Sequence, residues 1–347
     1  MSTELDSPSQ SILLNEARIN FTLSSAMDWG QDIKNPNTSN VGDAINKYLG
    51  KSTLTSSGIF KIVWGPAINV GESNNYAANI TAVFINTVTK NYILAFSGTN
   101  PNTPISDIFE DFDVSNLVNF SNYVDYCPRD AKISKATDTA FKIVRDTKPS
   151  SGSSLLSFLQ GLPENSTLTV TGHSLGGVLA STFALYLSEW SGYRHDYPFK
   201  DVFCQSFAAP TAGNIAFAIF SDMKLTGKLQ RFWHPYDVVP MAWNLFSSKK
   251  IESIYAPMLH LPKDETNDLN KLLTYFSNTN TYYMQLGSLD TYQQVQLPGD
   301  YYSDSSIKLF SDEAGWQHTF GYLKPLSLTA KDLNDGQPWP PKISTLD

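Results

Sequence analysis

Apolar residues recur along the chain with two different spacings, and these spacings divide it into predicted helices and strands. From Ser11 to Met27 the apolar side chains follow the period of a helix, which predicts an N-terminal helix with one buried face. Those side chains are Ile12, Leu13, Ala17, Ile19 and Leu23. Short apolar runs at 59–64, 82–85 and 92–96 predict antiparallel strands, the last two joined by a hairpin through residues 86–91.

Further along, apolar strands alternate with segments of helical spacing. We predict strands at 168–171, 202–208 and 230–234, and helices at 132–144, from Gly177 onward and from about Asn214. Two later apolar runs, at 281–286 and 292–297, predict a final two-stranded ribbon.

A serine flanked by glycines lies where the strand at 168–171 passes into the following helix. Gly172 and Gly176 stand two residues before and two residues after Ser174. Glycines let neighbouring backbone pass close beneath a strained turn, so the serine hydroxyl projects from the edge of the sheet. The pattern in this context is typical of a nucleophile elbow. The alternative is a glycine-rich loop that holds a buried serine.

A serine hydroxyl is a poor nucleophile at neutral pH, so it needs a base and an acid that holds the base in one tautomer. In chains with this elbow the acid and then the histidine follow the serine, each on a loop after a later strand. Asp237 follows the strand at 230–234 and the break at Pro235, which makes it the candidate acid. Its other interpretation is a solvated aspartate that begins a turn.

Five histidines limit the choice of base. We exclude His173 because its side chain lies inside the elbow, His195 because its surroundings indicate a polar surface loop, and His234 because it is too close to the candidate acid along the chain. His260 and His318 remain. We favour His318, which lies near the end of the folded region ahead of an apolar run, and His260 stays open as the alternative. Either histidine can instead have a purely structural role.

Acyl transfer also needs two backbone donors for the developing oxyanion. One donor is the amide of the residue after the nucleophile, Leu175. The second comes from the end of an earlier strand, and the turn Ser97-Gly98-Thr99 after the strand at 92–96 offers the amide and hydroxyl of Thr99. An ordinary strand-ending turn has the same spacing.

Four segments together carry a family resemblance: residues 95–99, 172–177, 207–210 and 236–240. The chain resembles the class 3 lipases from roughly its first helix to His318. The resemblance implies an α/β-hydrolase fold, with a central mostly parallel sheet flanked by helices and a helical lid, and hydrolysis of acylglycerol or phospholipid esters. It also implies a triad of Ser174, Asp237 and His318 and supports Thr99 and Leu175 as oxyanion donors.

The chain departs from the family pattern at two places. Relatives often have arginine before the glycine of the oxyanion turn, where this chain has Ser97, so the salt bridge made there by relatives is not expected. The stretch from Asn270 to Tyr302 is longer than the resemblance leads us to expect.

The net charge and the aromatic content limit the classes of partner that the chain is expected to bind. A formal net charge of -8 argues against nucleic acid and against electrostatic adhesion to an anionic membrane, because both favour a basic surface. We expect a lipid ester substrate at an oil-water or membrane interface, contacted by hydrophobic groups. The 20 Phe, 17 Tyr and 7 Trp supply such groups, although many of them belong to the core.

An amphipathic segment follows the oxyanion turn and is a candidate lid within residues 102–120. Its apolar side chains fall at helical spacing, while acidic residues occupy mostly the other face. The apolar side chains are Ile105, Ile108, Phe109 and Phe112. Such a helix can cover an acyl pocket in water and turn outward on oil. An ordinary surface helix is the alternative.

We treat residues 1–347 as a single α/β-hydrolase domain with a flexible N-terminus at 1–10, since no linker or internal repeat divides the chain. No metal-ligand spacing occurs, so we expect neither a metal nor a cofactor. Cys127 and Cys204 are far apart and predict no disulfide. The chain begins without the basic start and apolar core of a secretory signal, which favours a cytoplasmic protein or one exported without a cleavable leader.

The sequence thus predicts a serine hydrolase that acts on lipid esters as a triacylglycerol lipase. Two other enzymatic functions stay open, a phospholipase A1 and a carboxylesterase of soluble esters. Outside catalysis, the alternative is a lipase-like scaffold that binds a partner or lipid without hydrolysis.

Overall fold

The structure is a computed structural model that describes residues 8–56, 58–70, 76–100, 114–150, 152–193, 198–288, 293–304 and 307–329. In these residues a seven-stranded sheet runs in the order β1-β2-β3-β6-β7-β8-β9. Its strands are β1 (Phe60–Val70), β2 (Ala77–Asn86), β3 (Tyr92–Phe96), β6 (Ser166–His173), β7 (Phe199–Phe207), β8 (Leu229–Trp233) and β9 (Gln294–Gln296). A separate two-stranded sheet pairs β4 (Leu117–Asn119) with β5 (Lys132–Ser134).

The sheet is antiparallel at one edge and parallel over the rest. β1 pairs with β2 and β2 with β3 in antiparallel fashion, and Phe84 stands opposite Ile93 in the predicted hairpin. From β3 through β9 every neighbouring pair is parallel. The predicted α/β fold with a mostly parallel sheet is therefore confirmed. Because parallel strands end at one edge, the loops after β3, β6 and β8 meet there.

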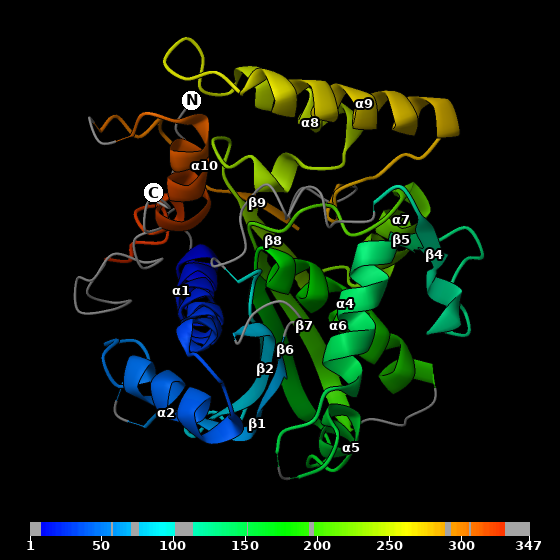
Figure 1. The fold of residues 1–347 in the computed structure, drawn as a ribbon. Coiled ribbons are helices and arrows are strands. Elements are labelled where there is room, and N and C mark those ends of the chain that lie inside the picture. The colour runs from blue at the N-terminus through cyan, green and yellow to red at the C-terminus, as the bar shows by residue number, and fades with distance from the viewer. Residues whose placement is uncertain are drawn as a thin grey trace.

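Helices cover both faces of the sheet (Figure 1). They are α1 (Pro8–Trp29), α2 (Thr38–Leu49), α4 (Lys135–Asp146), α5 (Leu155–Gln160), α6 (Leu175–Tyr193) and α7 (Ile215–Lys224), with short 3-10 turns η1 (Gly30–Asp32) and η2 (Phe120–Asn122). Successive side chains of a strand point to opposite faces. Leu94 and Phe96 of β3 accordingly join the core beneath α4, α6 and α7, whereas Ile93 and Ala95 join the core beneath α1 and α2.

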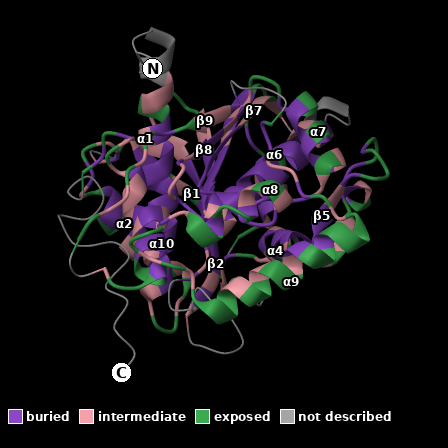
Figure 2. Cartoon of the chain, turned by 90° about the horizontal axis from the view of Figure 1, so that it is seen from above, coloured by how far each residue is buried: buried purple, intermediate pink, exposed green. Residues whose placement is uncertain are grey.

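A third group of elements lies at the end of the molecule to which the parallel strands point, with α9 running across it (Figure 1). The group contains η3 (Val239–Met241), α8 (Leu245–Ser248), η4 (Ile251–Ser253), α9 (Lys263–Thr279), α10 (Phe310–Thr319) and η5 (Phe320–Tyr322). Most of α9 is exposed (Figure 2). Its buried side bridges two small clusters, one around Tyr255 and Phe310 and one around Phe276 and Tyr283.

The prediction of a final ribbon at 281–286 and 292–297 is wrong. Tyr283 makes an isolated bridge to Asn214, and its hydroxyl donates to the carbonyl of Val114 at 2.6 Å, so this segment packs under α9. β9 instead extends the main sheet beside β8, where it supplies hydrogen-bond partners that the strand edge would otherwise lack. The unexpectedly long stretch from 270 to 302 includes the last turns of α9 and this added strand.

Candidate active site

Ser174 occupies a strained turn between β6 and α6. Its φ angle is +58°, a left-handed conformation that residues other than glycine rarely adopt. The turn requires close backbone approach, because a Cβ atom on Gly172 would lie 2.1 Å from the carbonyl oxygen of Gly176. A Cβ atom on Gly176 would lie 2.6 Å from the carbonyl oxygen of Phe96. Ser174 itself is only half-buried, so the strained turn presents its side chain at the edge of the sheet.

The turn after β3 lies directly against this elbow. A Cβ atom on Gly98 would stand 3.4 Å from Cβ of Ser174 and 3.1 Å from the carbonyl oxygen of His173. Within the described residues, the amides of Thr99 and Leu175 donate to no acceptor, and the Thr99 hydroxyl is buried without a partner. The two predicted oxyanion donors are thus free, Leu175 as the chain neighbour of Ser174 and Thr99 as the chain neighbour of Gly98, which lies against Ser174.

Side chains from α1 and η1 hold this turn from behind. Asp28 accepts a hydrogen bond from the amide of Gly98 at 2.7 Å, and Gln31 donates from Nε2 to the carbonyl of Gly98 at 2.9 Å. Both side chains are buried. Burial raises the pKa of Asp28 well above its usual value, and the charge of Asp32 adds to the increase, although the Gly98 amide opposes it.

Asp237 lies in the loop after β8 and is fully buried. Its carboxylate oxygens lie 3.1 and 3.0 Å from Nδ1 of His318, and it accepts further hydrogen bonds from the Tyr322 hydroxyl at 2.7 Å and the Val239 amide at 3.0 Å. Burial alone would raise the pKa of Asp237, but the His318 charge and these donors outweigh burial and hold the pKa below its usual value. An ionised Asp237 fixes the proton of His318 on Nδ1 and leaves Nε2 able to accept one.

A buried cation lies behind the same loop. Arg231 on β8 donates from Nη2 to the carbonyl of Pro240 at 3.1 Å and to that of Ala209 at 3.4 Å. Burial lowers its pKa to about 10, which leaves the guanidinium charged at neutral pH. The charge of Asp237 acts in the opposite direction on that pKa, so the two side chains stabilise each other's ionised forms.

His318 is the second-last residue of α10, and two buried histidines hold the backbone there. His173 lies with Nε2 2.8 Å from the carbonyl oxygen of His318, and His234 with Nε2 2.8 Å from that of Gln317. Carbonyl oxygens only accept, so both Nε2 atoms carry protons. The last carbonyls of a helix have no partner within the helix. We call His173 and His234 the histidine clasp.

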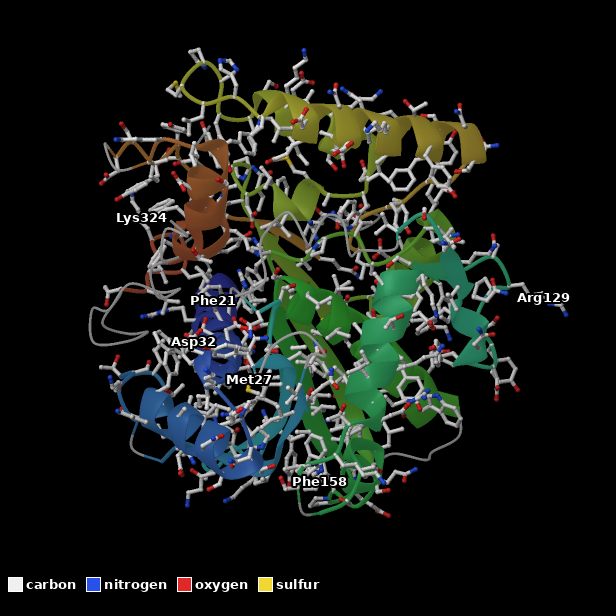
Figure 3. All side chains as sticks on the ribbon, viewed as in Figure 1. Phe21, Met27, Asp32, Arg129, Phe158 and Lys324 are labelled. Carbon is white, nitrogen blue, oxygen red and sulfur yellow. The ribbon has the colours of Figure 1, made fainter. Side chains whose placement is uncertain are left out.

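Both members of the clasp are neutral. Burial lowers the pKa of His173 to about 3, with a further contribution from the charge of His318. Burial also lowers the pKa of His234, although Asp237 opposes the shift. The ring of His173 lies 4.6 Å from that of His318, and Phe21 of α1, marked in Figure 3, packs edge-on against His173. The chain neighbour of Ser174 therefore contacts the candidate base.

Ser174, Leu175, Thr99 and Asp237 lie at or after the ends of β3, β6 and β8, and His318 of α10 contacts Asp237 and the ring of His173 at the same edge. His318 lies on a helix rather than on the loop expected, because the C-terminal end of α10 contacts Asp237 in the loop after β8. Its side chain is 16% exposed, so solvent reaches it. In the described part of the chain the Ser174 hydroxyl makes no hydrogen bond.

Other predicted residues lie elsewhere. His260 is exposed in the loop before α9 and makes no hydrogen bond to Asp237. The candidate lid residues Ile105, Ile108, Phe109 and Phe112 lie outside the described residues, as does His195. Residues 117–119 at the end of the candidate lid range form β4.

The sequence patterns did not predict a role in the site for several polar residues that surround it. Asp28 and Gln31 lie at and just beyond the end of a helix that was identified only by its apolar side. Arg231 and His234 belong to a strand and its end that were interpreted through their aromatic neighbours. Tyr322 offered the clearest signal, because it follows His318 by one helical turn.

The two cysteines are free and buried, and burial raises the pKa of Cys127 to about 12. No group of three or more His, Cys, Asp or Glu among the described residues is arranged to hold a metal ion. In the same part of the chain, every helix is too short or too polar to cross a membrane.

A known protein family matches part of the sequence, and the structure of M37 lipase shares the fold. Residues 93–246 match the family described as lipase (class 3). The crystal structure of M37 lipase has a TM-score of 0.78 and 25% sequence identity, covering 92% of this chain and 95% of that one. The LIP2 lipase of Yarrowia lipolytica and lipase II of Rhizopus niveus have TM-scores of 0.49 and 0.48, each with 18% identity over 69% of this chain and 77% of theirs.

Proposed function

We propose that this chain, which belongs to the class 3 lipase family through residues 93–246, hydrolyses carboxylic esters of lipids as a triacylglycerol lipase. The family resemblance drawn from the sequence motifs is confirmed, and membership suggests lipid ester hydrolysis. The observation that carries the proposal is the buried Asp237, paired with His318 beside the strained turn of Ser174. These three groups have the chemistry of nucleophile, base and orienting acid.

In the proposed reaction, the Ser174 hydroxyl oxygen attacks the ester carbonyl carbon while Nε2 of His318 takes the hydroxyl proton. The carbonyl oxygen becomes an oxyanion, which the amides of Thr99 and Leu175 stabilise. The C–O bond to the alcohol then breaks, and His318 gives its proton to the leaving alcohol. Water attacks the acyl-enzyme by the same route and releases the fatty acid, which restores Ser174.

Two features support the charges that develop. The imidazolium formed on His318 lies against ionised Asp237, which also receives hydrogen bonds from Tyr322 and Val239. In the proposal the oxyanion forms beside two free amides, one of which, that of Leu175, is at the start of α6. The positive end of that helix dipole stabilises negative charge.

The Ser174→Ala variant tests the function. We expect turnover of an emulsified triacylglycerol to fall on the order of 10³-fold or more, with the fold intact. The matched control is Ser181→Ala in α6, where a buried hydroxyl donates to the Val178 carbonyl at 2.9 Å. That variant should keep its activity. A serine-directed phosphonate should label wild-type protein on Ser174 only.

Wild-type turnover by the Ser174→Ala variant, or a label on another residue, would refute the assignment. The same enzyme preparation tested on triacylglycerols, phospholipids and short soluble esters decides the substrate. We expect the highest kcat/KM on triacylglycerol. A preference for phospholipid or for soluble ester would instead identify a phospholipase or a carboxylesterase.

A further inference from the structure

The backbone of the oxyanion turn is fixed by two side chains that come from outside the family-matched segment. Gly98 has one amide donor and one carbonyl acceptor, and both are occupied. The Asp28 carboxyl accepts a hydrogen bond from the amide at 2.7 Å, and the Gln31 side chain donates one to the carbonyl at 2.9 Å. The two partners are three residues apart in the chain, at the end of α1 and in η1. Two consecutive elements, α1 and η1, thus hold both the amide and the carbonyl of Gly98.

The bond from Gln31 sets the direction of the neighbouring amide. The carbonyl of Gly98 and the N–H of Thr99 belong to one planar trans peptide unit, in which they point in opposite directions. A side chain that holds the carbonyl therefore aims the Thr99 N–H away from itself. The turn lies between η1 and the elbow, where a Cβ atom on Gly98 would nearly touch both Asp28 and Ser174.

Gln31 is itself held in place. It is fully buried, and its Nε2 also contacts the Ser97 hydroxyl at 3.1 Å and the Ala78 carbonyl at 3.2 Å. Its backbone carbonyl accepts from Asn100 at 3.3 Å on the far side of the turn. The course of α1 and η1 past the sheet can be followed from Phe21 through Met27 to Asp32 in Figure 3. A rigid anchor of this kind costs little reorganisation when charge develops.

The chemistry of Asp28 suits this position. Its second carboxyl oxygen is buried and has no hydrogen-bond partner within the described residues. Burial raises its pKa well above the usual value, which favours the uncharged acid. An uncharged carboxyl accepts the Gly98 amide without setting a negative charge beside an oxyanion.

We propose that Gln31 and Asp28 are positioning residues that hold the Gly98 peptide groups and thereby aim the Thr99 amide at the oxyanion. The inference rests on the proposed esterase function and adds to it the residues that orient one of its donors. Neither side chain contacts the substrate in this proposal. The two residues therefore affect the transition state rather than substrate binding. The oxygen that the Thr99 amide stabilises becomes charged only after the ester has bound.

The test compares two disruptive variants with a conservative one. Gln31→Met keeps the length of the side chain and removes its donor, and Asp28→Leu removes the acceptor. We expect each to lower kcat about 10-fold or more with KM unchanged, and to slow phosphonylation of Ser174 by the same factor. Asp28→Asn retains an oxygen that accepts from the Gly98 amide, so its kcat should stay within about twofold of wild type.

A matched control separates positioning from stability. Asn20 on α1 donates to Gln205 on β7 at 2.7 Å, so Asn20→Leu also breaks a buried amide contact of the same helix. We expect Asn20→Leu to lower Tm and leave kcat unchanged. If Gln31→Met lowers Tm as Asn20→Leu does but keeps wild-type kcat and phosphonylation rate, the positioning role is refuted while the esterase function stands.

A measurement on the wild-type protein covers the case in which a variant does not fold. In a crystal structure of the phosphonylated enzyme, the Thr99 amide should lie within hydrogen-bond distance of the phosphonyl oxygen while Gln31 still contacts the Gly98 carbonyl. A reversed Gly98-Thr99 peptide, or a broken contact to Gln31, overturns the inference alone. If the phosphonate does not react with Ser174 and esters are not hydrolysed, both the function and the inference fail.

Discussion

Two regions of the site have backbone held in place by buried side chains, and they differ in whether the side chains only donate hydrogen bonds or also accept one. At the end of α10, the histidine clasp donates to the carbonyls of Gln317 and His318. At the turn after β3, Asp28 accepts from the Gly98 amide while Gln31 donates to its carbonyl. In both regions the supporting side chain is buried and comes from a different part of the chain. A candidate catalytic group is thus oriented through its backbone as well as through its own side chain.

The electrostatics of the two regions differ in the sign of the charge that each must tolerate. A cation develops on His318 during the proposed reaction, and its neighbour His173 stays neutral because burial lowers its pKa to about 3. An anion develops beside Thr99, and there burial raises the pKa of Asp28. Burial disfavours the charged form of both an imidazole and a carboxyl. The same physical effect therefore removes the unfavourable charge on each side.

The two regions also differ in where their parts originate. The clasp histidines lie within the family-matched residues 93–246 and support a base, His318, that lies beyond them. The oxyanion turn lies within the matched segment and is supported by Asp28 and Gln31, which precede it. In each region, therefore, one partner of the hydrogen bond lies inside the family-matched segment and the other lies outside it.

The largest effect should come from the acid on the base side. Asp237→Asn keeps the shape of the side chain and removes the charge that stabilises the imidazolium and selects its tautomer. We expect kcat to fall about 10³- to 10⁴-fold while KM changes little. Steady-state kinetics with a short-chain ester measure the loss. A decrease of less than about tenfold would mean that Asp237 does not orient His318 during turnover.

A smaller effect should follow from breaking the clasp. His173→Phe and His234→Phe keep a ring in the core but leave a carbonyl of α10 unpaired, at a cost of about 1–3 kcal/mol each. We expect kcat to fall about tenfold in each variant because His318 is less well oriented. Phe21→Leu is the control, since Phe21 packs on His173 without a hydrogen bond. If the two histidine variants have the same kcat as the Phe21→Leu control, the clasp has no role in orienting His318.

The smallest effect concerns stability on the oxyanion side. The folded-state pKa of Asp28 is raised above its unfolded value near 3.8, so the stability that its protonation provides is complete below that pH and is lost as pH rises through the folded pKa. The Asp28→Asn variant has an amide at this position, which does not titrate in this pH range. We expect its Tm, relative to wild type, to rise by about 2 °C or more between pH 4 and pH 8. Thermal scans at both pH values measure the difference, and a difference that does not change with pH would contradict a raised pKa.

Local pattern was sufficient for much of the fold. The glycines around Ser174 mark a close backbone approach that depends on a few neighbouring residues, so the turn was predictable from the sequence. The hairpin from β2 to β3 was predictable for the same reason. The ribbon predicted at 281–286 failed because a short apolar run does not specify its partner. Tyr283 and β9 find their partners through packing against α7, α9 and β8.

The candidate site divides in the same way. Asp237 was identified by its place after a strand, and His318 by elimination among five histidines. Asp28 and Gln31 were not identified, because each acts across about 70 positions of sequence on a turn whose own residues give no sign of them. A buried polar residue near the end of a helix has the same appearance in sequence as an exposed one.

The attachment of α1 to the oxyanion turn limits how this protein can be recombined. A chimera that receives only the segment shared with relatives would carry the elbow and the acid, but its turn would meet a foreign N-terminal helix. Such a hybrid could fold around its transplanted sheet and still hydrolyse slowly. Engineers who exchange parts between relatives should therefore transfer α1 and η1 together with the turn that these two elements hold.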